Sequence, residues 1–94
     1  MTPQKVLDQT RLYEEQLNGF HIPAVRIDVT KTFASLTREE LLAHAHYLCK
    51  GIPAFAQDPE RWGKTNRHYG SLQTILSTAG WLTLADMMND NKPR

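Results

Sequence analysis

Histidine and cysteine side chains are the first residues of this chain that could do chemistry. His44 and His46 lie two positions apart, and Cys49 follows His46 by three. Residues two apart on a helix point about 200° apart, so the two histidines cannot hold one metal ion together. His46 and Cys49 are neighbours on a helix surface and could supply two ligands, but no paired spacing of the zinc type occurs. We favour the alternative, in which His46 borders the core and Cys49 packs as a small hydrophobe, and we expect no metal or other cofactor.

Cys49 beside a histidine also suggests a nucleophile and its base. Catalysis would need a thiolate in a cleft and a base held in place by a third group. The chain contains neither a Gly-rich phosphate loop nor a nucleophile elbow. We therefore expect no catalytic residue and predict that the protein is not an enzyme.

A row of basic residues is the stronger candidate for a binding site. Its members recur at three- and four-residue spacing on or beside one face of a predicted helix: Arg61, Lys64, Arg67 and His68. Such a row could contact nucleic-acid phosphates, and the neighbouring aromatics Trp62 and Tyr69 could stack on bases if they were exposed. Both aromatics also fall on the apolar stripe of the same helix, which favours burial. The alternative is an ordinary solvated polar face.

Composition limits the classes of partner. The chain has 94 residues, with 11 Lys plus Arg against 10 Asp plus Glu, which gives a net charge of +1. This length predicts a single domain over residues 1–94, and the charge balance predicts no strongly charged tail. The single cysteine excludes an internal disulfide and is typical of a reducing compartment. No apolar run approaches membrane-spanning length, so we expect a soluble, cytoplasmic protein without a membrane partner.

Three longer helices are predicted from apolar residues that recur every three or four positions. The first begins with Thr2 as its cap and Pro3 as its first residue. It should end near Asn18 and Gly19, because both residues enter the left-handed region at low cost.

The second helix opens at Thr37, where Glu40 completes a capping box. Pro53 interrupts it, because proline cannot donate a hydrogen bond and disfavours helical geometry at the preceding residue. The apolar spacing continues beyond Pro53, so we expect a kinked helix, with an end at Lys50 as the alternative. Gln73 on the next helix could bond to the carbonyls freed around Pro53.

The third and fourth helices are delimited by caps. Asp58 could cap the third helix, although a start at Thr65 remains open. Gly80 supplies a left-handed stop. Thr83 then restarts a short helix, with Asp86 in the position of a capping box.

An alternating segment separates the first two helices. Val25, Ile27 and Val29 alternate with polar residues, which is the pattern of a strand. No other segment of the chain offers this strand a partner. We favour an extended arm whose apolar side lies over the helices. The alternative is antiparallel pairing with the same segment of a second subunit, which would make the protein a homodimer with these three residues at its interface.

The C-terminal third carries a recognisable pattern of a basic residue, a histidine, a Gly-x-x-Gln step, a glycine turn, a Thr-led short helix and an asparagine: Arg67, His68, Gly70, Gln73, Gly80, Thr83 and Asn91. It resembles a set of small helical bacterial and phage proteins with no known chemistry, and residues 36–49 echo them more weakly. Ser71 and Thr74 stand where those proteins often have an apolar residue and a second glycine. The resemblance implies a small helical accessory protein encoded on mobile DNA or phage, and carries no catalytic residue.

The sequence thus predicts a mainly α fold, with a small bundle of three principal helices, a short C-terminal helix and an extended arm near residues 24–30. Phe55, Trp62 and Trp81 are expected among the core residues. Our leading functional hypothesis is a non-enzymatic protein-interaction module that binds an unidentified protein or a second copy of itself. The second hypothesis is a nucleic-acid-binding accessory protein that uses the basic helix face.

Overall fold

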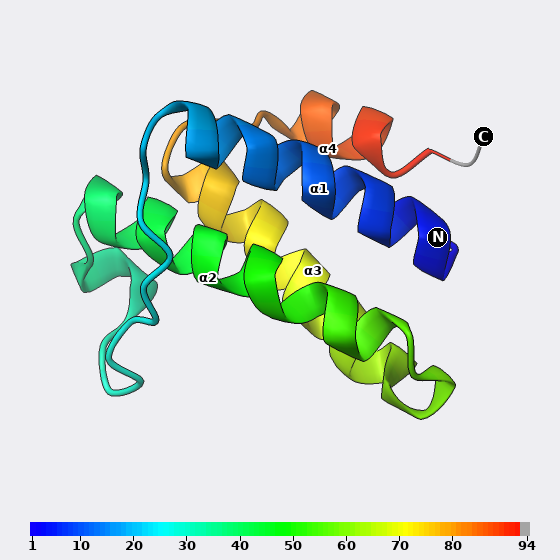
Figure 1. The fold of residues 1–94 in the computed structure, drawn as a ribbon. Helices are drawn as coiled ribbons and strands as arrows, with labels where there is room; N and C mark the ends of the chain where they lie inside the picture. Colours follow the sequence, from blue (N-terminus) through cyan, green and yellow to red (C-terminus); the bar gives the residue numbers. More distant parts are fainter. Residues whose placement is uncertain (93–94) are drawn as a thin grey trace.

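The computed structural model describes residues 1–92 and consists of helices, with one long connection between the first two α-helices and shorter ones elsewhere. Four α-helices follow one another along the chain: α1 (Pro3–Gly19), α2 (Arg38–Ala56), α3 (Trp62–Thr78) and α4 (Leu84–Asp90). Two 3₁₀ turns, η1 (Phe33–Ser35) and η2 (Pro59–Arg61), precede α2 and α3 (Figure 1). The mainly α class, with three principal helices, a short fourth helix and an extended arm, is confirmed, and residues 1–92 contain no strand.

The predicted caps account for most helix starts. The Thr2 hydroxyl accepts a hydrogen bond from the backbone N–H of Lys5. Capping boxes form at Thr37 with Glu40 and at Thr83 with Asp86. Each box satisfies two backbone donors that a helix start would leave unpaired.

Helix α1 ends at Gly19, as expected, but only one of the two expected left-handed stops is found where the sequence placed it. The residue with left-handed geometry after α1 is His21, with φ 58°, and not Asn18 or Gly19. The turn closes there because the N–H of Ile22 reaches back to the carbonyl of Leu17. At Gly80 the expected left-handed stop is present, with φ 88°.

The structure around the α2–α3 connection shows where the second helix ends and where the third begins, the two boundaries for which the sequence left alternatives. Helix α2 continues through Pro53 to Ala56, as expected from the apolar spacing. Asp58 does act as a cap, but for the turn η2, where its carboxylate accepts from the N–H of Glu60. Helix α3 therefore begins at Trp62, and Thr65 is a buried residue inside it.

The core lies where α1, α2 and α3 face one another, and α2 packs against both other helices. Its fully buried apolar residues come from all three helices: Val6, Leu17, Ala45, Ile52, Leu72, Ile75 and Leu76. Phe55, Trp62 and Trp81 are only partly buried. Trp62 and Trp81 pack against the edge of the core, whereas Phe55 lies near the end of α2 outside that cluster.

Helix α4 is held by a buried polar cluster instead of an apolar face, since none of its own residues is buried. We call this cluster the Gln73 network: Tyr13, Tyr69, Gln73, Asp90 and Asn91. The Gln73 amide donates to the hydroxyls of Tyr13, at 3.0 Å, and Tyr69, at 3.1 Å. Its carbonyl oxygen accepts from the Asn91 amide at 3.0 Å. Tyr13 in turn donates to the Asp90 carboxylate at 2.7 Å.

The Gln73 network corrects the expectation that Gln73 bonds to carbonyls near Pro53. Gln73 faces α1 and the end of α4, because α3 turns its Tyr69 and Gln73 side chains, one helical turn apart, to the same partners. Burial is the main reason that the pKa of Tyr13 is raised, and it raises that of Tyr69 to about 12, so both phenols stay protonated donors. The Gly-x-x-Gln step and the following asparagine of the sequence pattern therefore meet in space.

The segment of residues 22–32, which we call the arm, runs beside α2 without helix or strand and turns back at residues 28–31 (Figure 1). The N–H groups of Val25 and Ile27 bond to α2, at the carbonyl of Ala43 and at His44 Nδ1. Ile27 packs against the core, whereas Val25 and Val29 are exposed by 53% and 72%. The arm thus lies over the helices through Ile22 and Ile27, while Val25 and Val29 face outward. No helix within residues 1–92 has both the length and the apolar character needed to cross a membrane.

Candidate nucleic-acid interface

The four basic residues singled out in the sequence lie along α3 and its preceding turn, and we call them the α3 basic row: Arg61, Lys64, Arg67 and His68. Phe55, near the end of α2, lies against three of them. Lys64 Nζ is 4.1 Å from the centroid of the Phe55 ring, and Arg61 Cζ is 5.9 Å from it. The His68 ring meets the Phe55 ring edge-on, with centroids 5.1 Å apart. Phe55 therefore holds the row together at one end of the helix pair.

The charges of the α3 basic row are largely uncompensated. Arg61 lies 3.6 Å from the carboxylate of Asp58, in an exposed pair. Within residues 1–92 neither Lys64 nor Arg67 has a carboxylate within 4.0 Å. An exposed pair such as Arg61–Asp58 leaves the arginine available to another anion, because solvent screens it.

Of the two aromatic residues that could have stacked on bases from α3, Tyr69 is inside the Gln73 network and only 4% exposed. Trp62 is partly buried against the core. The expectation that the apolar stripe takes precedence is therefore fulfilled for Tyr69 and partly for Trp62. Aromatic residues other than Trp62 and Tyr69 take the exposed positions near the α3 basic row.

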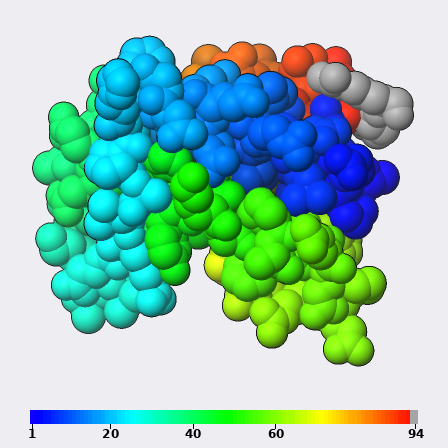
Figure 2. All heavy atoms as spheres, viewed as in Figure 1, coloured from blue at the N-terminus to red at the C-terminus, as the bar shows by residue number. Residues whose placement is uncertain are grey.

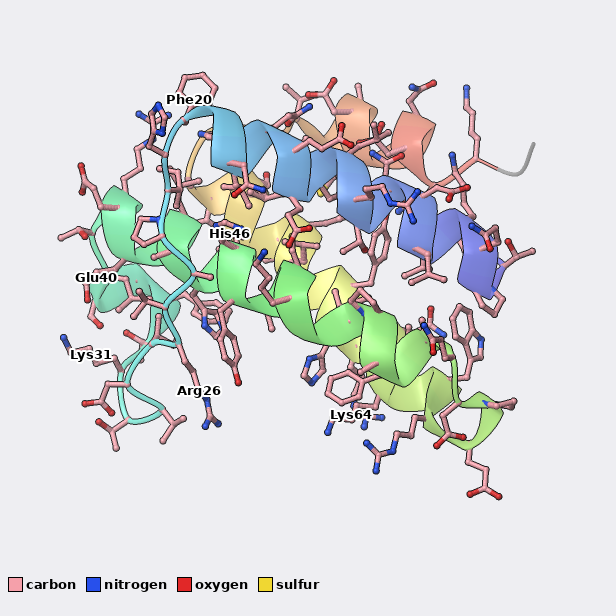
Figure 3. The ribbon with its side chains drawn as sticks, in the orientation of Figure 1. Phe20, Arg26, Lys31, Glu40, His46 and Lys64 are labelled. Carbon is pink, nitrogen blue, oxygen red and sulfur yellow. The ribbon has the colours of Figure 1, made fainter. Side chains whose placement is uncertain are left out.

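A groove of about 380 Å³ opens between the arm, α2 and α3, and we call it the arm groove. Figure 2 shows this hollow between the cyan arm and the green α2. Its polar and aromatic lining comes from these three segments and from η1: Arg26, Lys31, Phe33, His44, Tyr47, His68 and Ser71. No carboxylate lines it within the described part of the chain, although Lys31 lies 3.7 Å from Glu40 at its outer side. In Figure 3, Arg26 of the arm and Lys64 of α3 point to the same side of the molecule.

His44 is the best-defined side chain of the arm groove. Its Nδ1 accepts the Ile27 N–H at 3.3 Å, so the proton of the neutral ring sits on Nε2. The ring stacks on Tyr47, with centroids 5.7 Å apart and planes inclined by 14°. Phe33 of the turn η1 also lies beside the His44 ring, with centroids 6.4 Å apart.

Both histidines of the arm groove experience positive surroundings. Burial lowers the pKa of His44, and the charges of Arg26 and His68 lower it further. Burial also lowers the pKa of His68, followed by the charges of Lys64 and Arg67. Cations of the arm and of the α3 basic row thus act on the two histidines that line the groove between them.

The candidate pair His46 and Cys49 is buried among other partners. His46 Nδ1 lies 2.7 Å from the carbonyl oxygen of Ile22, and Nε2 lies 3.9 Å from the carboxylate of Glu14. Burial raises the pKa of the Cys49 thiol to about 12, with the Glu14 charge contributing. No group of three or more His, Cys, Asp or Glu side chains is placed to hold a metal ion within residues 1–92. The contacts of His46 tie the start of the arm and α1 to α2.

The α3 basic row could be predicted from the sequence, but the arm groove could not. The row follows from helical spacing, whereas Arg26 and Tyr47 come together only through the fold. The position of His44 on α2 could be predicted, because it lies one helical turn after Glu40 of the capping box. Its hydrogen-bond partner Ile27 could not be predicted from spacing. The two sites share His68 and form one continuous surface. The chain has no significant match among protein-family models, curated proteins or solved structures.

Proposed function

We propose that this protein is a nucleic-acid-binding accessory protein whose contact surface is the α3 basic row. The observation that carries the proposal is the alignment of Lys64 and Arg67, both without a carboxylate partner in residues 1–92, beside a groove lined by further cations. Exposed lysine and arginine side chains are the groups with which proteins neutralise nucleic-acid phosphates. The resemblance of the C-terminal third to bacterial and phage proteins supports an accessory role, and the free thiol of Cys49 supports a cytoplasmic location.

A polymer of phosphates suits this surface better than a single small anion. A helix rises about 1.5 Å per residue, so the row from Arg61 to His68 extends for about 10 Å. A duplex carries one phosphate charge per about 1.7 Å of its axis, so several phosphates fall within that length. Arg61 and Arg67 are exposed and Lys64 is only partly buried, so the row is open to a long ligand.

The test is the salt dependence of binding to a labelled oligonucleotide, followed by fluorescence anisotropy. Lys64→Ala with Arg67→Ala should weaken binding and lower the slope of log affinity against log salt by about 1.5, since each phosphate contact contributes about 0.7–0.9. The matched control is Lys5→Ala with Arg11→Ala, which removes the same charge from α1. Equal slopes for the two double variants would show that the α3 basic row is not the contact surface.

A protein-interaction role remains a second candidate, and the exposure of Val25 and Val29 favours it. Both side chains belong to the alternating segment that could meet a second copy of the chain or another protein. Sedimentation of the purified protein over a range of concentrations tests self-association. A dimer that dissociates in Val25→Ser with Val29→Ser would support an interface at the arm, and a monomer at all concentrations would exclude the homodimer.

A further inference from the structure

We propose that the arm groove binds one unpaired base of a single-stranded nucleic acid, while the α3 basic row holds the neighbouring phosphates. This inference rests on the proposed function and specifies its ligand. The groove lies next to the row, with His68 lining the one and belonging to the other. A nucleic-acid strand bound along the α3 basic row would therefore pass the opening of the arm groove.

Stacking is the first property that fits a base. Phe33 and Tyr47 are each 39% exposed, and both lie beside the His44 ring in the wall of the groove. Every base has a flat aromatic face, so exposed aromatic rings bind single strands without strict sequence preference. The partly exposed face of Tyr47 is the principal surface for this contact.

Polar groups and size are the second property. His44 Nε2–H has no hydrogen-bond partner among the described residues and can donate to a base edge or a phosphate. Ser71 adds a hydroxyl at the α3 side of the groove. The volume of about 380 Å³ lies at the lower end of the roughly 300–1,000 Å³ of small-ligand sites, as expected for one base.

The shape of the site favours a single strand over a duplex. The groove is bounded by the arm on one side and by α2 and α3 on the other, so a base must leave its stack to enter it. A duplex would have to unpair and flip that base, at a cost of several kcal/mol, whereas a single strand presents it freely. Arg26 and Lys31 on the arm supply cations at the opposite wall from the row.

The experiment compares three labelled ligands of equal length by anisotropy at one salt concentration: an oligothymidine strand, a duplex, and an oligothymidine strand with one abasic position at its centre. The variants are Tyr47→Ala, Tyr47→Phe, and Phe20→Ala as a control for the loss of an exposed aromatic side chain. Phe20 is 72% exposed and packs on Trp81, away from the groove. Circular dichroism verifies that each variant is folded.

We expect the single strand to bind at least about tenfold more tightly than the duplex, and Tyr47→Ala to lose about tenfold of that affinity. Tyr47→Phe should retain the affinity, Phe20→Ala should leave it unchanged, and the abasic strand should bind more weakly than the intact strand. Equal affinity for strand and duplex, unaffected by Tyr47→Ala, would overturn the inference and leave the proposed function standing. Absence of binding to all three ligands would overturn both.

Discussion

At the scale of single residues, Gln73 is the side chain with the most consequential contacts. It is 5% exposed and bonds to residues 60 positions before it and 18 positions after it in the chain. A buried amide at this position is favourable only while its partners are present. The Gln73 network therefore ties α1, α3 and the end of α4 into one arrangement.

Replacing Gln73 by methionine should lower the free energy of unfolding by about 2 kcal/mol, because the Asn91 amide and two tyrosine hydroxyls lose a buried partner. Urea unfolding followed by circular dichroism measures the change. Gln16→Met on the exposed side of α1 is the control and should change stability by less than about 0.5 kcal/mol. If Gln73→Met changed the free energy of unfolding as little as the control does, water would be replacing the hydrogen bonds of the Gln73 network without loss of stability.

The two groove histidines give a prediction in pH. The pKa values of His44 and His68 should lie below the ordinary value of 6.5, in NMR titrations of their ring protons. Since the unfolded chain then binds protons more readily, the stability contributed by the neutral rings is fully present above about pH 6.5 and is lost as pH falls. Arg26→Ala should raise the pKa of His44 only part of the way, because burial is the larger cause. Arg11→Ala should leave it unchanged, and an unshifted pKa in the parent protein would contradict the enclosed geometry of the groove.

At the scale of elements, α2 is notable for continuing past a proline. The ring of Pro53 removes the N–H that would bond to the carbonyl of Cys49, yet the helix extends to Ala56. Packing of Ile52 and Ala56 into the interior explains why the helix persists. The continuation has a consequence for the site, because the last turn of α2 carries Phe55 to the α3 basic row.

Pro53→Ala should therefore stabilise the protein by about 1–3 kcal/mol, since the new N–H can complete the helix ladder and the ring clash disappears. Thermal and urea unfolding measure the gain. Pro59→Ala is the control, because Pro59 is the first residue of η2, where a missing N–H costs nothing, and its replacement should be neutral or slightly destabilising. A loss of stability in Pro53→Ala would show that the helix is bent there for packing.

At the scale of the whole molecule, a single core joins the three long helices. The two tryptophans lie at opposite ends of α3 and can serve as fluorescence probes of those two regions. Trp62 begins α3 and Trp81 follows its C-terminal end, and both are packed against the core. Helix α4 depends on the Gln73 network, which is itself anchored in α1 and α3. The charge is arranged unevenly, since a net charge of only +1 coexists with the cationic surface around the arm groove.

Unfolding should accordingly be a single transition for the entire molecule. Trp62→Phe leaves Trp81 as the sole tryptophan, and Trp81→Phe leaves Trp62. In each variant the fluorescence midpoint in urea should coincide with that of far-UV circular dichroism. An earlier fluorescence transition in Trp62→Phe would show that the end of α3 near Trp81 opens on its own.

The sequence by itself determined the elements whose signals are local. The capping boxes at Thr37 and Thr83 and the turn at Gly80 involve residues at most five positions apart, so they can be identified without knowledge of the fold. The α3 basic row belongs to the same class, because helical spacing alone places its members on or beside one face. The class of fold and the candidate surface on α3 could thus be predicted.

Only the tertiary structure decided the partners of those elements. The bonds of Gln73 to Tyr13 and Asn91, the contact of Phe55 with Lys64, and the arm groove all join segments that local spacing does not relate. Such contacts depend on how whole helices pack, and a buried polar side chain takes whichever partner the packing brings to it. For that reason the sequence placed the cations on α3, and only the fold placed Arg26, His44 and Tyr47 beside them.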